Sequence, residues 1–252
     1  MSWIFDSCLD SPAPTPSPPV QVFFAILMAA HMNESSVLTY VDQMMSTIEE
    51  MDPSIADGYR LVYDRECPLE LRVQDSSASE GPQQVGTLEA IKVKVLVLGE
   101  DTAMHSIRIE LSCESDLFFH FSSTLDEAGF QEVQERQKLM VDFPDYPNVI
   151  SRMLNNCIKE PHNHLAVFVI QQSPIRTGRL DFIQNMEYKF IELMSCHFEH
   201  SQEEAVQQQI SYRYNAMKAR LNLVTQRLQE VNSVLKVKNP SLLLQLQKQT
   251  RS

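Results

Sequence analysis

The chain has 252 residues, 43% of them hydrophobic, which is enough for one sizeable core or two small ones. Its formal net charge of -12 argues against the basic surface that nucleic-acid binding requires, so DNA and RNA are not expected as main partners. The five cysteines are dispersed, which favours buried thiols in a reducing compartment over disulfides or a zinc site.

Residues 1–58 are expected to form a leader and a helical extension. Residues 1–19 are rich in proline and favour a disordered, extended leader, with docking into an aromatic groove as the alternative. The apolar run of residues 20–30 is too short to span a bilayer and follows no lysine or arginine, so neither a membrane anchor nor a secretory signal is expected. Within residues 20–58, a helical stripe that ends at Asp52-Pro53 either covers core or binds a partner; it comprises Val37, Val41, Met44, Ile48 and Met51.

Residues 59–200 are expected to form a head domain rich in strands. Two helices, residues 126–137 and 147–159, interrupt it. The fold class is mainly β with α: a seven-stranded β-sandwich or barrel head with an inserted helical pair, followed by a long C-terminal helix of coiled-coil type. Alternating or fully apolar segments predict strands at residues 61–63, 69–73, 91–97, 107–111, 117–121, 139–143 and 165–170, and a hairpin of residues 180–183 and 190–194 with its tip within 184–189.

Residues 201–238 are expected to form a stalk helix, followed by a tail of residues 239–252. Asn239-Pro240 ends the helix, because proline disfavours the helical conformation of the residue before it. A heptad stripe on the helix needs a second helix or its own domain to bury it, and both arrangements stay open. The stripe consists of Ile210, Tyr214, Met217, Leu221, Val224, Leu228, Val231 and Leu235.

The positions that flank this stripe do not favour a homodimer. With Ile210 at position d of a parallel pair, no salt bridge forms between the g and e positions, and Tyr214 at a is bulky. We therefore expect a weak stalk that needs head contacts or an acidic partner helix to stay paired. The facing residues are Arg213 with Lys218, Arg220 with Thr225, and Arg227 with Asn232.

No motif for catalysis or cofactor binding occurs in the sequence. The six glycines are dispersed, so there is no phosphate-binding loop, and no nucleophile elbow is present. His162 and His164 form a His-x-His pair without a third ligand at a recognisable spacing, so no metal site is expected. The sequence disfavours an enzyme and predicts no catalytic residue, cofactor or metal.

Several segments of the head resemble the spindle assembly abnormal protein 6 family, which builds the hub of the centriolar cartwheel. The resemblance runs from about residue 61 to about residue 196, and the stalk helix stands where the family's coiled coil begins. It is carried by the order and spacing of residues 67–73 (Cys-Pro-Leu-Glu-Leu-Arg-Val), 118–121 (Phe-Phe-His-Phe), 125–127 with Phe130, 139–143 (Leu-Met-Val-Asp-Phe), 146–147 (Tyr-Pro) and 154–157.

The resemblance implies a β-sandwich head, a helical pair and a parallel coiled-coil dimer. It also implies that heads pair through a hydrophobic residue on a hairpin tip, which enters a pocket on the neighbouring head, so that dimers can close into rings. The residues that match this tip are Tyr188 and Lys189, with Phe190 as the alternative if the hairpin register is shifted. A half-exposed strand tyrosine without this role is the other interpretation of Tyr188. Phe130, Val141 and Phe143 are pocket candidates only by their position near the helical pair.

Two departures from the family favour its short paralogue, the "like" form without the long coiled-coil tail: the short stalk and the N-terminal extension. This implies a self-associating structural scaffold in the cytoplasm and cytoskeleton, at a basal body or centriole, a flagellar base or an apical complex. The partners would be further copies of the chain, with other basal-body or cytoskeletal proteins also open. The alternative is a DNA double-strand-break repair adaptor with the same head-plus-stalk fold, against which the net charge of -12 argues.

Overall fold

The computed structural model describes residues 43, 45–75, 86–100, 103–172 and 176–238. The chain divides into two compact units, Met1–Ile48 and Glu49–Ser252. Of the first unit, the described residues are helical. The Pro-rich leader, most of the expected N-terminal helices, the polar loop after residue 75 and the tail after residue 238 lie outside the described residues.

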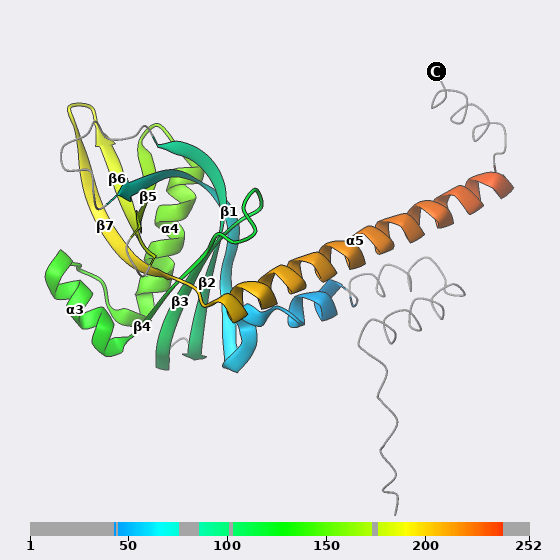
Figure 1. Cartoon of the computed structure of the whole chain (residues 1–252), viewed down its shortest axis with the longest axis horizontal. Coiled ribbons are helices and arrows are strands. Elements are labelled where there is room, and N and C mark those ends of the chain that lie inside the picture. The colour runs from blue at the N-terminus through cyan, green and yellow to red at the C-terminus, as the bar shows by residue number, and fades with distance from the viewer. Residues whose placement is uncertain (1–42, 44, 76–85, 101–102, 173–175, 239–252) are drawn as a thin grey trace, which may run out of the picture. The chain divides into compact units, whose positions relative to one another are not determined.

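Seven strands of the second unit close into a barrel, as expected from the alternation of apolar residues (Figure 1). Their order around the barrel is β1-β2-β3-β4-β7-β6-β5, and all neighbours are antiparallel except β1 and β5, which are parallel. The strands are β1 (Tyr59–Asp75), β2 (Thr87–Glu100), β3 (Ala103–Cys113), β4 (His120–Asp126), β5 (His164–Gln172), β6 (Thr177–Met186) and β7 (Lys189–His200).

The first two predicted strands are one long strand, β1. Pro68 lies in its middle, where a missing backbone N–H would normally interrupt a central strand. Here β1 pairs with β2 from Tyr59 to Leu71, whereas its pairing with β5 begins only at Glu70. Pro68 therefore lies where one edge of β1 has no strand beside it, and the strand continues through it.

Two other strand predictions are wrong, one in part and one throughout. Residues 117–119 form a turn, and the strand begins only at His120. Residues 139–142 are not a strand, because no neighbouring strand pairs with them. The backbone carbonyl of Val141 instead accepts a hydrogen bond of 2.7 Å from the Gln134 side chain. At residue 143 the short 3-10 helix η3 (Phe143–Asp145) begins.

The inserted helical pair is confirmed as α3 (Glu127–Gln137) and α4 (Tyr146–Lys159). Asp126 caps α3 by accepting a hydrogen bond from the Gly129 backbone N–H at 2.8 Å. Pro147 stands in the first turn of α4, where its missing donor costs nothing. The buried face of α4 packs against β1 and β5 and belongs to the same core as the barrel interior (Figure 1).

Aromatic rings fill the centre of the barrel. Phe121 of β4 lies with its ring centroid 5.1 Å from that of Phe168 of β5, and Phe168 lies 5.7 Å from Phe198 of β7, in edge-to-face arrangements. Gly178 of β6 lets the ring of Phe168 lie against the backbone, because a Cβ at this position would clash with it. This packing ties together strands that are far apart in the sequence.

Candidate interaction surfaces

The β6–β7 hairpin carries Tyr188 and Lys189, which match the family's tip, and Phe190, the alternative. Its ladder runs from Thr177 opposite Glu199 to Met186 opposite Lys189, so that Glu187 and Tyr188 form the turn. Tyr188 is 95% exposed and Phe190 64% exposed. The predicted hairpin is therefore confirmed, and the exposed rings of Tyr188 and Phe190 lie at its end beside the charged residues Glu187 and Lys189.

A bulge turns the hairpin between this tip and the barrel. The pairing register shifts between Phe182 and Ile183, and Leu193 is left without an opposite residue. A bulge reverses which residues of a strand face the core. Phe190 consequently stands opposite Asn185 outside the core instead of continuing the buried row of β7.

The residues considered for a receiving pocket do not line an open one. The ring of Phe130 is buried, with its centroid 4.8 Å from that of Tyr146 and 5.3 Å from that of Phe143. Val141 is half-buried. These rings fill the core beneath α3 and α4, so they hold the helical pair on the barrel.

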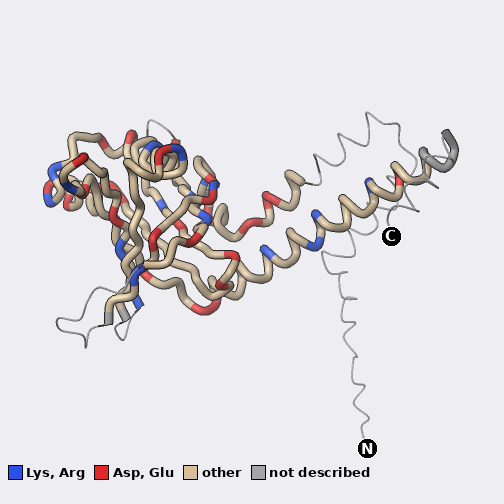
Figure 2. The backbone as a smooth tube through the Cα atoms, turned by 90° about the horizontal axis from the view of Figure 1, so that it is seen from above, with Lys and Arg blue, Asp and Glu red and all other residues tan. Residues whose placement is uncertain are grey.

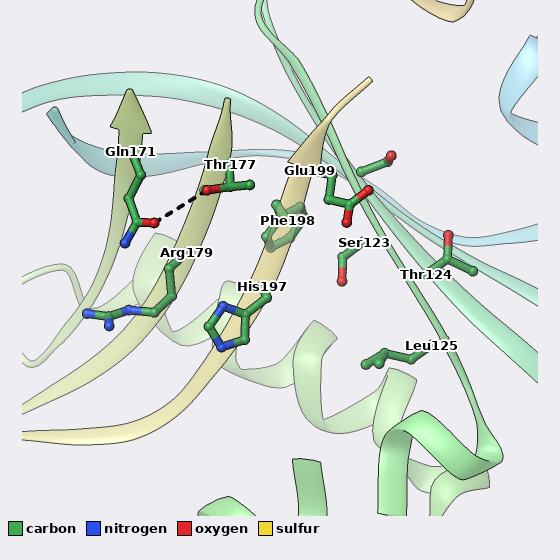
Figure 3. A pocket seen from close by; sticks show the side chains of 11 residues that line it. Ser123, Thr124, Leu125, Gln171, Thr177, Arg179, His197, Phe198 and Glu199 are labelled. Carbon is green, nitrogen blue, oxygen red and sulfur yellow. Dashed lines mark hydrogen bonds between the residues drawn. The ribbon is translucent and has the colours of Figure 1, made fainter. Parts of the chain in front are cut away.

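A cavity of about 510 Å³ lies where β4 and β7 separate (Figure 3). The two strands pair only at Phe121 with His200 and Ser122 with Glu199. Farther along β7, the Gln137 side chain takes the place of a strand by binding the backbone N–H and C=O of Ser195 at 2.9 and 2.7 Å. Most of the residues that line it are polar: Ser123, Thr124, Gln171, Thr177, Arg179, His197 and Glu199.

The stalk helix is α5 (Glu203–Lys238), and its heptad stripe is exposed. Ile210 is half-buried, and Leu235 lies in the helix beyond the described side chains. Burial on the chain's own head, one of the two open arrangements, is therefore wrong for the six exposed members. Their exposed fractions are 63% for Tyr214, 68% for Met217, 64% for Leu221, 58% for Val224, 59% for Leu228 and 46% for Val231.

A different face of α5 is fixed to the head by a buried polar network. The Lys94 ammonium of β2 forms an ion pair with Asp52 and donates to the Ser54 hydroxyl at 2.9 Å. Gln209 of α5 donates to the same hydroxyl at 2.9 Å, and this hydroxyl donates to Glu110 of β3 at 2.6 Å. Ser54 belongs to the 3-10 helix η2 (Pro53–Gly58). The network thus joins four elements: η2, β2, β3 and α5.

Electrostatics favour the ionised form of Asp52 in this network. Burial alone would raise the pKa of Asp52, but the Lys94 ammonium and hydrogen bonds from Lys94 and Ser54 bring it below its ordinary value. In the sequence, Asp52-Pro53 marks only the end of a helical stripe, and nothing there indicates this role of Asp52 and Ser54. The sequence gives no signal that separates Lys94 from Lys92 two residues earlier, although Lys92 forms an exposed pair with Asp64.

His120 at the start of β4 makes the head sensitive to acid. Its ring is buried, and its Nδ1 lies 2.8 Å from the Ser201 hydroxyl, just before α5. Burial first, and then the cations Lys94, Arg213 and Arg108 with His200, lower the pKa of His120 to about 4. The folded protein therefore favours the neutral ring.

We expect acidification from pH 7 to pH 5 to cost about 2 kcal/mol of stability through His120. The unfolded imidazole, with a pKa of about 6.5, gains a proton over this interval and the folded one does not. The stabilisation is complete above the unfolded pKa and is lost as the pH falls toward 4. Urea unfolding at pH 7 and pH 5, of the protein and of its His120→Asn variant, measures the part of the change in unfolding free energy that comes from His120. Equal pH dependence of the two proteins would contradict this role of His120.

The described residues contain no cluster of three or more histidine, cysteine or acidic side chains arranged for a metal ion. Within the same described ranges, no helix is long and apolar enough to cross a membrane.

Comparison with known proteins gives one consistent family. The family described as "Centriolar protein SAS N-terminal domain" matches residues 61–198. The Spindle assembly abnormal protein 6 homolog of Gallus gallus is 26% identical over 81 residues, which cover 32% of this chain and 13% of that protein. The Xenopus laevis homolog is 33% identical over 63 residues, or 25% of this chain and 9% of that protein. The chain thus matches only about a tenth of the length of these relatives.

Solved structures share the fold. An N-terminal fragment of Drosophila melanogaster Sas-6, dimerised via the coiled-coil domain, superposes with a TM-score of 0.60 at 14% identity, over 79% of this chain and 93% of that one. An N-terminal fragment of Leishmania SAS-6 that contains part of its coiled-coil domain gives a TM-score of 0.56 at 14% identity, over 70% of this chain and 98% of that one. At this identity the similarity concerns the fold alone.

Proposed function

The chain belongs to the family of the centriolar protein SAS N-terminal domain, and from this premise we propose that it is a non-catalytic structural scaffold of the centriole that associates with copies of itself. Two surfaces of the chain would make the contacts. The stripe on α5 pairs two stalks into a coiled coil, and the hairpin tip at Tyr188, Lys189 and Phe190 pairs heads of neighbouring dimers. Two different contacts on one chain allow dimers to assemble further, into closed rings or open arrays.

The observation that carries this proposal is the exposure of the α5 stripe. From Tyr214 to Val231, six apolar side chains at heptad spacing are each at least 46% exposed. A long contiguous apolar face on a folded chain marks an interaction site. Its heptad period fits a second helix that winds around the first.

The hairpin tip supports the second contact. Tyr188 and Phe190 are exposed at the end of a two-residue turn, and the Tyr188 hydroxyl has no hydrogen-bond partner among the described residues. Burying this hydroxyl without an acceptor would cost about 1–3 kcal/mol. Head pairing is therefore weak unless the neighbouring head supplies an acceptor.

We place the scaffold at a basal body, a flagellar base or the apical cytoskeleton, as the short paralogue of the family would be. Fluorescence microscopy of a tagged copy beside a centriolar marker tests this. Signal at one of these structures supports the proposal, whereas diffuse nuclear signal that moves to DNA breaks would support the repair-adaptor alternative and exclude the scaffold.

We expect Tyr188→Glu to abolish association between heads. A carboxylate is costlier to bury than a phenol, so the loss exceeds tenfold in the dissociation constant. Tyr188→Phe should strengthen the contact by up to about tenfold, because it removes a hydroxyl that has to be desolvated. Analytical ultracentrifugation of the full chain carrying Leu221→Asp, which removes stalk pairing, isolates the head contact.

Met140→Glu is the matched control for Tyr188→Glu. Met140 is 98% exposed and lies between α3 and η3, away from the β6–β7 turn. The Met140→Glu substitution should leave head association unchanged. If Tyr188→Glu has no larger effect than Met140→Glu, Tyr188 does not belong to the head contact.

A further inference from the structure

The stalk helix carries an unbalanced positive charge along its exposed length. Between Ala205 and Gln229 it contains four basic residues and no acidic one, although the chain as a whole has a net charge of -12 (Figure 2). Arg227 is neutralised within the helix by Glu230 at 3.2 Å. In a parallel pair, Arg213 of one helix would face Lys218 of the other, and this contact joins two like charges.

The structure shows where Arg213 is held. Its guanidinium donates two hydrogen bonds of 3.2 Å to the backbone carbonyl of Cys113, the last residue of β3. Arg213 stands at a g position, on the flank of the stripe nearest the head. The β3–β4 turn (residues 114–119), which starts at the next residue, therefore lies beside the same flank.

The β3–β4 turn presents an acidic and apolar surface. Glu114, Asp116, Leu117 and Phe118 are all exposed, with Phe118 at 68%. Among the described residues, neither carboxylate forms an ion pair. The turn is nevertheless ordered: Asp116 accepts a hydrogen bond from the Phe118 N–H at 3.0 Å, and the Phe118 carbonyl lies 3.2 Å from His200 Nε2.

We propose that the β3–β4 turn of one copy binds the stalk helix of a second copy, with Glu114 and Asp116 neutralising the partner copy's lysine at position 218 and Leu117 and Phe118 extending the apolar contact. This inference rests on the proposed pairing of stalks and names a second contact in the same dimer. The g position of Arg213 faces the partner's e position 218, so the turn beside Arg213 lies on the flank along which that lysine passes.

The chain's own Lys218 cannot take this place. Positions e and g lie on opposite flanks of a heptad stripe, so Lys218 points away from the flank on which its own head holds Arg213. The acidic turn and the basic helix are complementary only between two copies. Each head therefore binds the other copy's stalk helix, and this contact compensates for the missing salt bridges within the coiled coil.

Charge reversal at position 218 tests the proposal, because the dimer dissociation constant should change in opposite directions with and without the turn contact. In a coiled coil without the turn, Lys218→Glu would face Arg213 of the partner and strengthen the dimer. With the turn in place, the same variant meets Glu114 and Asp116 and weakens the dimer about three- to tenfold. Analytical ultracentrifugation of the full chain at low salt measures the dissociation constant, and the effect should shrink at 0.5 M salt, where the screening length is only a few Å.

The reciprocal variant completes the experiment. Glu114→Lys with Asp116→Asn, which keeps the oxygen that accepts from Phe118, should weaken the dimer by a similar factor, and combination with Lys218→Glu should restore it. Glu132→Lys with Glu135→Gln on α3 makes the same charge change on exposed residues elsewhere and should have no effect.

The apolar part of the contact has its own test. Phe118→Ser should weaken the dimer several-fold, and Met140→Ser, at a more exposed methionine, should not. If Lys218→Glu strengthens the dimer, or if the paired variants fail to restore it while Leu221→Asp still abolishes it, the inference is wrong and the stalk pairing stands. A chain that is monomeric at every concentration would overturn both.

Discussion

Lys94→Met is expected to lower the free energy of unfolding by about 3–5 kcal/mol, because it leaves the Asp52 carboxylate buried without its cation. The side chains of Lys94 and Asp52 are 10% and 8% exposed, so water cannot replace the lost ion pair. The Ser54 hydroxyl also loses a donor at the point where η2 meets α5. Urea unfolding at pH 7, followed by circular dichroism, gives the difference between variant and wild type.

Lys92→Met provides a matched control on the same strand. Lys92 pairs with Asp64 at 3.0 Å, but both side chains are about one third exposed, at 37% and 32%. Such a pair contributes about 0–1 kcal/mol. Equal destabilisation by the two substitutions would show that the buried network does not hold the head together. A further replacement of Asp52 by Asn in the Lys94→Met protein should recover part of the loss, because no uncompensated charge is left.

Leu221→Asp is expected to weaken stalk pairing by more than about 100-fold, or roughly 3 kcal/mol. Leu221 occupies an a position in the middle of the stripe, so a parallel pair would bring two carboxylates face to face in an apolar seam. The substitution touches no head contact, since the Leu221 side chain is 64% exposed. Sedimentation equilibrium of the full chain, over micromolar to millimolar concentrations, measures the shift.

Asn222→Asp makes the same charge change one residue farther along the helix. Asn222 is exposed and lies off the stripe, so we expect a change of less than about twofold in the dimer dissociation constant. Association that persists in Leu221→Asp but disappears in Tyr188→Glu would mean that copies meet through their heads alone.

Much of the barrel could be predicted because strand periodicity is a local signal. The apolar alternation of β2 and β3 follows directly from their burial on the inner face of the barrel. Residues 139–143 carry the same kind of pattern, yet no partner strand lies beside them, and Gln134 instead binds the Val141 carbonyl and the Leu139 N–H. A pattern in one segment cannot show whether a neighbour exists to pair with it.

The candidate surfaces also differ in how far they could be predicted from neighbouring residues in the sequence. The hairpin tip at Tyr188 was predictable because its two strands are consecutive in the chain. The network at Ser54 was not, since Lys94 lies 40 residues away and Gln209 lies 155 residues away along the sequence. The heptad stripe predicted a binding face, but only its exposure in the folded chain showed that the head does not cover it.

The network at the base of α5 also fixes the angle between the helix and the head. With 36 residues, α5 is about 54 Å long, so each degree of play at its base displaces its far end by about 1 Å. If the base of α5 were held only by water-exposed contacts, small differences in this angle would add up from copy to copy in an assembly. Hydrogen bonds and an ion pair that are shielded from water restrict this angle more tightly than exposed contacts do. A few buried side chains of the head thereby determine how uniformly the stalk helix is oriented.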